Sequence, residues 1–170
     1  MEPSALEKYR KAGKIVRDIF ESLKVQPGTK ILALADDIEA ELIRKGAKPA
    51  FPVNISINEV AAHYTPEFGD ETSVRPGDIV KVDIGAHVDG YIADASVSYC
   101  SEKNSNESAM ISASENALSQ ALKAMRPGAK ICEISEIIES EIVSKGFVPV
   151  GNLTGHALDC YMFHGDITIP

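Results

Sequence analysis

IVKVDIGAHVDGYIADASVSY, residues 79–99 of the sequence, predicts two antiparallel strands joined by a tight turn. Its β-branched residues are typical of strands, and Asp89-Gly90 is a strong hairpin signal because glycine adopts positive φ at little cost. Successive side chains point to opposite faces of a strand. One face of this hairpin is therefore apolar, and the other carries Asp83 and Asp94.

The two aspartates are expected to be close neighbours. With the two-residue turn at Val88-Asp89 or at Asp89-Gly90, they lie directly opposite or one diagonal apart, with Cβ atoms roughly 4.5–8 Å apart. Two carboxylates this close need a cation, a shared proton or bulk water. The pair is either an exposed polar strand face or, because the flanking sequence is apolar and Gly-rich, a buried pair that binds a divalent metal.

The composition limits the class of protein. The chain has 170 residues, enough for one domain with a core, and a net charge of −8 with no basic cluster, which argues against nucleic acid and membrane surfaces as partners. The three scattered cysteines indicate a reducing compartment rather than a disulfide framework. No apolar run reaches membrane-spanning length, and the N-terminus lacks the apolar core of a signal peptide. We therefore expect a soluble, cytoplasmic protein.

Apolar periodicity predicts two helices before the hairpin. Ser4 and Glu7 form a capping box, which predicts that the first helix covers residues 4–24. Thr29 is expected to cap the second helix, and Gly46 is placed to end it.

Two further helices are predicted after the hairpin, one at residues 107–125 and one that Gly146 ends. Their expected buried stripes are Ile111, Leu118, Leu122 and Met125 in the first, and Ile131, Ile134, Ile138 and Ile142 in the second. Strands are predicted at residues 51–57 and 148–153, and a second extended piece is expected to lead from the former to His63.

An internal repeat relates residues 27–49 to residues 127–149. PGTKILALADDIEAELIRKGAKP aligns without a gap with PGAKICEISEIIESEIVSKGFVP, and shared helical composition does not explain the common Pro-Gly start, Lys-Gly end and trailing Pro. We infer one domain, residues 1–170, made of two αβ halves with pseudo-twofold symmetry. Residues 1–100 contain the hairpin, whereas residues 101–170 lack one, so the sequence is expected to be a fragment or one piece of a two-chain assembly.

Four histidines are candidates for chemistry: His63, His87, His156 and His164. His87 lies beside the predicted turn and is expected to be exposed. His156 lies in GNLTGH, where the glycines let the backbone approach a site closely. Together with Asp83 and Asp94, it forms an Asp, Asp, His set that suits a divalent ion such as Mn, Fe, Co or Zn.

Three motifs together resemble the type II methionine aminopeptidases, most of all the archaeal form: AFPVNISINEVAAHYTP, RPGDIVKVDIGAHVDGYIADAS and NLTGHALDCYMFHGDITIP. The resemblance covers the whole chain. It implies the α+β pita-bread fold, in which an antiparallel β-sheet is covered by helices and two αβ halves are related by pseudo-symmetry. The second half is expected to be truncated in this chain.

The resemblance implies a hydrolase with two divalent ions (Co, Mn, Fe or Zn) that removes the initiator methionine from nascent proteins and peptides. Three of the family's five metal ligands are matched: Asp83 as a bidentate carboxylate, Asp94 as the bridging carboxylate, and His156 as the imidazole ligand. Two glutamate ligands belong to the family's C-terminal half. This chain alone is therefore expected to be inactive and to need a complementary C-terminal half chain.

The resemblance also implies that His63 and His164 are catalytic and contact the substrate and the developing tetrahedral centre. Phe51 and Phe163 are expected to line the pocket for the methionine side chain. The expected partner is a peptide with an N-terminal methionine, with neither nucleic acid nor membrane. Two alternatives stay open: a prolidase-like dipeptidase, which the HYTP and NLTGH motifs disfavour, and a non-catalytic binding protein of the same fold, which the retained ligands disfavour.

Overall fold

The computed structural model describes residues 2–102 and 105–170, which divide into two compact units. Unit 1 is built from the chain up to Ser101 together with the segment Leu158–Phe163. Unit 2 is built from Glu102–Ala157 together with His164–Pro170. A short stretch near the C-terminus therefore packs with the N-terminal unit, which the sequence pattern did not predict.

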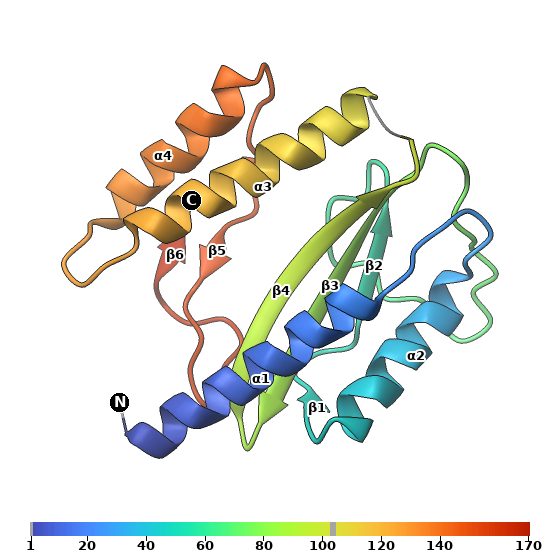
Figure 1. The fold of residues 1–170 in the computed structure, drawn as a ribbon, viewed down its shortest axis with the longest axis horizontal. Helices are drawn as coiled ribbons and strands as arrows, with labels where there is room; N and C mark the ends of the chain where they lie inside the picture. Colours follow the sequence, from blue (N-terminus) through green and yellow to red (C-terminus); the bar gives the residue numbers. More distant parts are fainter. Residues whose placement is uncertain (1, 103–104) are drawn as a thin grey trace. The chain divides into compact units, whose positions relative to one another are not determined.

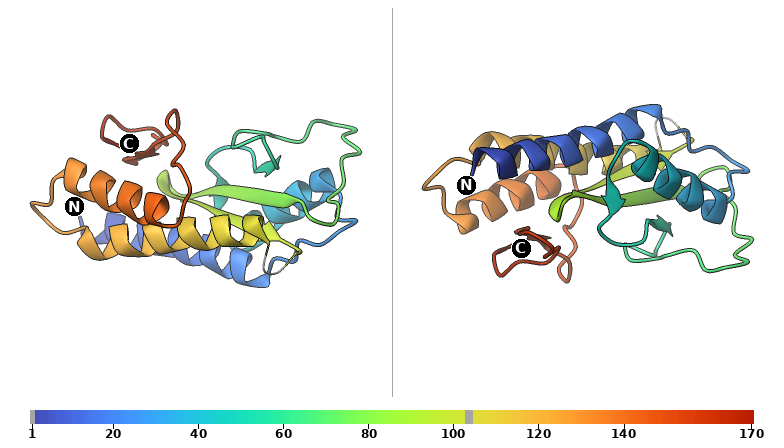
Figure 2. Two further views of the ribbon diagram at one scale, coloured as in Figure 1. Left: turned by 90° about the horizontal axis from the view of Figure 1, so that it is seen from above. Right: turned by 90° about the horizontal axis from the view of Figure 1, so that it is seen from below.

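Unit 1 is a four-stranded antiparallel sheet with two helices on one face (Figures 1 and 2). Its elements are α1 (Pro3–Ser22), α2 (Ile31–Arg44), β1 (Lys48–Pro49), β2 (Asn54–Ile57), β3 (Ile79–Val88) and β4 (Tyr91–Cys100). Strand β3 is the centre of the sheet, because it pairs with β4 along its whole length and with β1 and β2 on its other side.

The core of unit 1 lies between the helices and the apolar face of β3. Val82 and Ile84 are fully buried, as are Ile38 and Leu42 of α2. Burying each such side chain contributes about 1.5–3 kcal/mol relative to leaving it exposed. The alternation of faces predicted for the hairpin is confirmed, and it leaves the opposite face of the sheet for polar groups.

The β3–β4 turn has the two-residue form expected of Asp-Gly. Val88 pairs with Tyr91, so Asp89 and Gly90 are the two turn residues, with φ of 50° and 89°. Positive φ at both positions is the type I′ geometry, whose twist matches that of the strands. Of the two turns that the sequence allowed, the structure has Asp89-Gly90.

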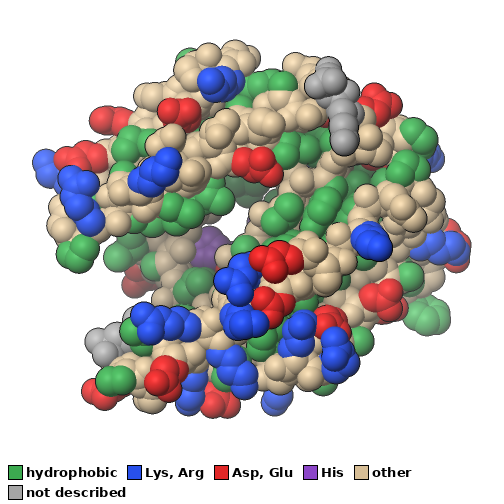
Figure 3. Space-filling view, viewed as in Figure 1, with side chains coloured by type: hydrophobic (Ala, Val, Ile, Leu, Met, Phe, Trp, Pro, Cys, Tyr) green, Lys and Arg blue, Asp and Glu red, His purple; other side chains and the backbone are tan. Residues whose placement is uncertain are grey.

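Helix α1 begins and ends earlier than predicted, and the capping box of Ser4 and Glu7 is wrong. Pro3 is the first helical residue and Glu2 caps the helix without a side-chain hydrogen bond. Proline suits the first helical position because its φ is preset and its missing N–H is not needed there, so Ser4 lies inside the helix. The outer face of α1 carries charges of both signs (Figure 3).

Helix α2 also begins without the predicted cap. Lys30 is its N-cap residue and makes no side-chain cap bond, while the Thr29 hydroxyl accepts a hydrogen bond from the Gln26 amide at 3.3 Å. Thr29 therefore stabilises the turn before the helix and does not cap the helix. Gly46, with φ of 82°, follows the end of the helix as predicted.

The predicted strand at residues 51–57 is shorter than expected, and the extended piece leading to His63 is a loop. Asn58 has φ of 53°, which ends β2. Its side chain stabilises this reversal, because Nδ2 donates to Asp78 Oδ1 at 2.8 Å and Oδ1 accepts from the Ile79 amide at 3.0 Å.

Unit 2 contains two packed helices and a short two-stranded sheet. Its elements are α3 (Asn106–Ala124), α4 (Ile131–Ser144), β5 (Gly155–His156) and β6 (Thr168–Ile169). Figure 2 shows α3 and α4 side by side. The bounds of α4 repeat those of α2 at an offset of 100, as the internal repeat predicts.

Two sequence predictions for unit 2 are wrong: the buried stripe of α3 and the strand at residues 148–153. Ala113, Ala117 and Ala121 are the buried residues of α3, whereas Leu118 and Leu122 are 58% and 57% exposed. Alanine lets the two helix backbones approach closely, so the small residues face α4 and the leucines do not.

In α4, Ile134 is the buried apolar residue of the predicted stripe. Residues 148–153 form no strand; β5 forms later and includes His156. None of the helices within the described residues has the length and apolarity needed to cross a membrane.

Candidate metal centre and substrate pocket

The β3–β4 register places the two aspartates on one face of the sheet. Asp83 pairs with Ser96 and Asp94 pairs with Gly85, so the carboxylates are diagonal neighbours rather than directly opposite. Both residues are half-buried. The predicted proximity of Asp83 and Asp94 is confirmed.

The carboxylate pair is electrostatically unfavourable when nothing neutralises it. Burial, followed by the charge of Asp94 and a hydrogen bond with it, raises the pKa of Asp83 to about 7. An aspartate at that value holds a proton about half of the time at neutral pH. A divalent cation ligated by both carboxylates would replace this proton, so the donor set fits a hard or borderline metal ion.

Polar residues of β2 extend the same face. Asn54 pairs with Asp83 and Ser56 pairs with Lys81, and both β2 residues are buried. Burial lowers the pKa of Lys81, whose Nζ donates to the Asn58 carbonyl at 2.7 Å. The side chains next to the carboxylates on this face of the sheet can therefore form hydrogen bonds.

These β2 side chains hold the segment that carries His63. Asn54 Nδ2 donates to Thr65 Oγ1 at 2.8 Å, and the Tyr64 amide donates to Ser56 Oγ at 3.3 Å. The Ile55 amide also donates to the Tyr64 carbonyl at 2.7 Å.

His63 itself has φ of 66° and is exposed. A positive φ is uncommon for a residue with a side chain and persists only where neighbours fix it. Here the bonds to Tyr64 and Thr65 do so. His63 lines a cavity of about 580 Å³ together with Tyr64, Thr65 and the loop that follows them.

The two phenylalanines predicted to line the methionine pocket lie together. The rings of Phe51 and Phe163 have centroids 6.1 Å apart and planes tilted by 51°. The ring of Phe51 lies on Gly85, where an added Cβ would be only 2.2 Å from Cε1. Since Gly85 pairs with Asp94, this aromatic pair borders the carboxylate site.

In unit 2, the structure brings His156 and His164 together. Their ring centroids are 4.4 Å apart in an edge-to-face arrangement. The chain returns between them because the Gly165 amide donates to the Ala157 carbonyl at 2.7 Å and the Ala157 amide donates to the Ile167 carbonyl. An added Cβ at Gly165 would lie 2.8 Å from the Ala157 oxygen, so glycine is needed there.

The predicted metal ligands are divided between the units, with Asp83 and Asp94 in unit 1 and His156 in unit 2. Within neither unit do the described residues include a group of three or more His, Cys, Asp or Glu that could hold a metal ion. Sequence reasoning missed Gly85, Asn54 and Ser56 as parts of this region. A glycine inside a strand is the signal that could have identified the first.

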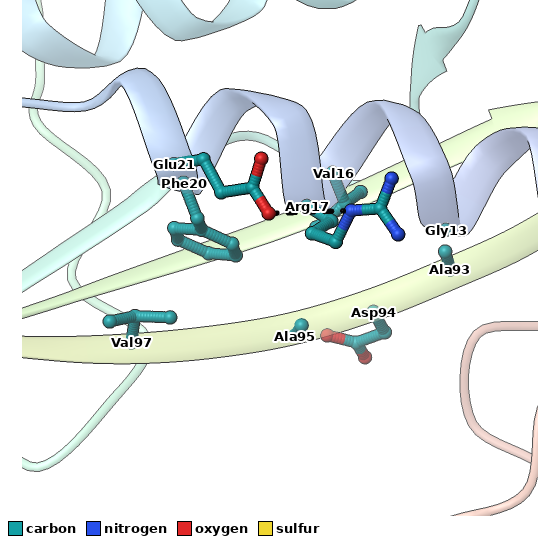
Figure 4. Close-up of a pocket in the computed structure, with 9 residues that line it drawn as sticks. All are labelled: Gly13, Val16, Arg17, Phe20, Glu21, Ala93, Asp94, Ala95 and Val97. Atoms are coloured by element: carbon teal, nitrogen blue, oxygen red, sulfur yellow. Dashed lines mark ion pairs between the residues drawn. The ribbon is translucent and has the colours of Figure 1, made fainter.

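A second depression in unit 1 lies between α1 and β4 (Figure 4). It has a volume of about 490 Å³ and is lined mainly by apolar groups, including Val16, Phe20 and Ala95. Arg17 and Glu21 form an ion pair at 3.5 Å on its helical side. Asp94 also lines this depression, between Ala93 and Ala95, so the groove borders the strand that carries half of the carboxylate pair.

Comparison with known proteins identifies the class to which this fold and carboxylate pair belong. Residues 7–170 match the family model of metallopeptidase family M24, and the chain belongs to that family. Like its solved relatives, it has the pita-bread fold.

Relatives within the family are named methionine aminopeptidase. The chain is 46% identical over 167 residues to one from Pyrococcus abyssi, covering 97% of this chain and 56% of that protein. It is 44% identical over 178 residues to one from Methanothermus fervidus, covering 97% and 95%. The solved methionine aminopeptidase of Thermotoga maritima superposes with a TM-score of 0.90 at 28% identity, covering all of this chain and 72% of that one. The chain thus spans little more than half of the Pyrococcus relative's length.

Proposed function

We propose that this chain contributes part of a two-metal aminopeptidase site that removes the N-terminal methionine from nascent proteins and peptides. The observation that carries the proposal is the half-buried diagonal pair of Asp83 and Asp94, with the pKa of Asp83 raised to about 7. The names of relatives at 44–46% identity support methionine as the residue removed. We propose that the protein acts in the cytoplasm, where nascent chains emerge.

Asp83 and Asp94 would hold divalent ions together with His156, and Asp94 would serve both ions as the bridging ligand. Such ions, when bound, supply Lewis-acid activation of water and of the scissile carbonyl. Cobalt, manganese, iron and zinc all suit this mixed oxygen and nitrogen donor set.

His63 and His164 are proposed to act on the substrate. An imidazole N–H that donates to the developing oxyanion or the leaving amine stabilises the transition state, typically by 10²–10³ in rate per donor. The left-handed backbone of His63, in a segment fixed by the bonds to Tyr64 and Thr65, sets the direction in which its side chain leaves the loop. The edge-to-face contact with His156 does the same for His164.

Phe51 and Phe163 are proposed to contact the methionine side chain. Their tilted rings present apolar surface next to the carboxylates, and Phe163 is 42% exposed, which leaves a ring face for a ligand. A thioether interacts favourably with aromatic edges and tolerates irregular apolar surfaces.

The metal proposal is tested by calorimetric titration with Mn²⁺, Co²⁺ and Zn²⁺ of the 170-residue chain combined with a polypeptide that supplies the remaining part of the site. Asp94→Ala should remove binding of both ions, because the bridging ligand serves both, whereas Asp83→Ala should weaken one ion more than the other. Asp37→Asn, a change to an exposed acid of α2, is the matched control and should bind as the unmodified chain does. Unchanged binding by Asp94→Ala contradicts the assignment.

The complete site is proposed to include two further carboxylates from a complementary polypeptide. The part of the Pyrococcus abyssi relative that this chain does not match is a concrete candidate for that complement. Hydrolysis of a Met-Ala-Ser peptide should be weak or absent with the chain alone and should rise when the complement is added with metal. Preferential hydrolysis of a Xaa-Pro dipeptide would favour the dipeptidase alternative, and metal binding with no hydrolysis of either would favour a binding protein.

A further inference from the structure

The segment Leu158–Phe163 contacts the β3–β4 turn through its backbone. The Tyr161 amide donates to the Gly90 carbonyl at 2.8 Å, and the Cys160 thiol lies 3.8 Å from the Asp89 carbonyl. These contacts join parts of the chain about seventy residues apart, which explains why a piece of the C-terminal sequence belongs to unit 1.

The side chains of the segment Leu158–Phe163 also pack closely against the β3–β4 turn. An added Cβ at Gly90 would lie 2.4 Å from Tyr161 Cε2 and 2.9 Å from Cys160 Sγ. Although Tyr161 is 72% exposed, the edge of its ring fills the space above Gly90. Glycine is thus required at position 90 for two reasons: the backbone has a φ of 89°, and there is no space for a side chain.

His87 supports the contact from the strand below. Its ring meets that of Tyr161 edge to face, with centroids 5.5 Å apart and planes at 61°. Its Nδ1 accepts a hydrogen bond from the Gly90 amide at 3.1 Å. The sequence predicted an exposed His87; it is half-buried instead, because the turn and the segment Leu158–Phe163 cover it.

Tyr161 holds an unfavourable backbone conformation in this segment. Asp159 and Met162 exchange two backbone hydrogen bonds, of 2.9 and 3.0 Å, and so enclose Cys160 and Tyr161 in a tight turn. Tyr161 has φ of 57° at the second central position, where glycine is usual. A tyrosine persists there only if its surroundings fix it, and the contacts with Gly90 and His87 do so.

The turn ends one residue before Phe163, whose ring packs on Phe51. Phe51 in turn lies on Gly85, the partner of Asp94. A continuous set of contacts therefore runs from the hairpin turn, through Tyr161, to the aromatic pair beside the carboxylates.

We propose that Gly90 and Tyr161 are positioning residues for the methionine pocket: they anchor the segment Leu158–Phe163 and so set the separation of Phe163 from Phe51. That separation determines how wide a side chain the pocket accepts. The identity of the pocket rests on the proposed function, whereas the positioning itself does not.

The positioning is tested by ¹⁹F NMR of the 170-residue chain with 4-fluorophenylalanine at its five phenylalanines. Phe51→Leu and Phe163→Leu assign the two pocket signals, and the fully exposed Phe68 is the internal reference. Gly90→Ala should move the Phe163 and Phe51 signals. Gly28→Ala is the matched control, because its φ of 90° imposes the same backbone strain and nothing lies within 4 Å of an added Cβ.

Adding Tyr161→Gly to Gly90→Ala removes the ring that the new methyl group meets, so the Phe163 signal should return to its position in Tyr161→Gly alone. Equal Phe163 spectra for Gly90→Ala and Gly28→Ala would overturn the proposal. If Gly90→Ala does not fold, Tyr161→Gly and Tyr161→Phe decide: Tyr161→Gly should move the Phe163 signal and Tyr161→Phe should leave it in place. An unmoved signal in both would also overturn the proposal.

Titration with L-methionine and L-norleucine separates this inference from the proposed function. Both ligands should shift the Phe51 and Phe163 signals of the unmodified chain, and Gly90→Ala should weaken that binding several-fold relative to Gly28→Ala. Amino acids that shift no signal in any variant count against the methionine pocket. The Phe163 signals of the ligand-free variants would still decide the positioning.

Discussion

Asp83 links protonation to the stability of the metal-free chain. Its pKa is about 7 in the folded state, against 3.8 for an ordinary aspartate, so the folded state binds more protons than the unfolded state between these values. The free energy of unfolding should therefore fall as the pH rises from about 4 to about 7. The loss is on the order of 1–2 kcal/mol once solvent screening of this partly exposed pair is allowed for.

Thermal unfolding followed by circular dichroism, in the presence of a chelator, measures this dependence. Asp83→Asn should be less sensitive to pH over the same range, because the group that titrates is gone. Addition of Mn²⁺ should restore stability at pH 7 to the unmodified chain and not to the variant. A variant with the same pH profile as the unmodified chain contradicts the assignment of the raised pKa to Asp83.

Gly85 should not tolerate a side chain. Gly85→Ala would place a methyl group 2.2 Å from the Phe51 ring in the interior of β3, and overpacking of this kind typically costs about 1–3 kcal/mol. Gly13→Ala is a control of opposite sign: its Cβ would meet nothing closer than 4.0 Å, and alanine stabilises a helix by about 0.5–1 kcal/mol relative to glycine. Denaturant unfolding of both variants measures the difference.

At the scale of single residues, the sequence pattern predicted the carboxylate pair because alternation in a strand and the Asp-Gly turn together determine its register. It did not predict that Gly85 receives the Phe51 ring or that Gly90 receives Tyr161. Each of those contacts joins two segments that are distant in the sequence. Only the complete fold brings them together, so no local sequence pattern predicts the contact. The capping box failed for a local reason, since Pro3 competed with Ser4 for the start of the helix.

Helices α2 and α4 are the elements that the internal repeat makes directly comparable. Ile38 of α2 is 1% exposed, whereas its counterpart at an offset of 100, Ile138, is half-buried. Ile138 lines a groove of about 480 Å³ in unit 2 together with Ile142 and Leu153. The equivalent apolar stripe is therefore buried in α2 but only partly buried in α4.

This difference predicts unequal mutational costs at equivalent positions. Ile38→Ala should destabilise unit 1 by about 2–5 kcal/mol because it leaves a cavity in a packed core. Ile138→Ala should cost clearly less, because its side chain is already in part hydrated. Chemical denaturation of the two variants tests this, and equal costs would show that Ile138 is packed as tightly as Ile38.

At the scale of elements, α1, α2 and α4 were predictable from their apolar period, and α2 and α4 also from the glycine that follows each of them. The buried face of α3 was not, because alanine contributes little to an apolar pattern and yet permits the closest packing. The strands of unit 2 were also missed. Two-residue strands such as β5 and β6 are too short to show an alternation of apolar and polar residues.

Among the described residues, most of the large apolar side chains that are more than half exposed belong to unit 2. Leu118, Leu122, Val143, Val148 and Val150 are each more than half exposed. Large apolar surfaces of this kind mark sites of association. The 170-residue chain should therefore self-associate in a concentration-dependent way, as measured by light scattering coupled to size exclusion.

Leu118→Gln together with Leu122→Gln should reduce that association without loss of helix content. The control is Phe68→Ala, which removes a fully exposed ring from unit 1 and should leave the association unchanged. A chain that stays monomeric at high concentration would contradict this prediction.

The fold class was predictable for the whole molecule because the repeat, the hairpin and three motifs all indicate the same architecture. The placement of Leu158–Phe163 in unit 1 was not, since a packing partner seventy residues away has no signature in either segment. The roles proposed for His63 and His164 come from resemblance. The structure adds that the His164 ring packs against His156 and that Asn54 and Ser56 fix the segment that carries His63, which the sequence does not show.

The contact between Gly85 and Phe51 also limits how this sequence can diverge. A descendant that acquires a side chain at position 85 keeps this backbone only if position 51 has already lost its ring. The reverse order is open, because a smaller residue at position 51 merely leaves space above the glycine. The two sites should therefore covary across relatives in a directional manner, with substitution at 51 preceding substitution at 85 along any lineage in which both have changed.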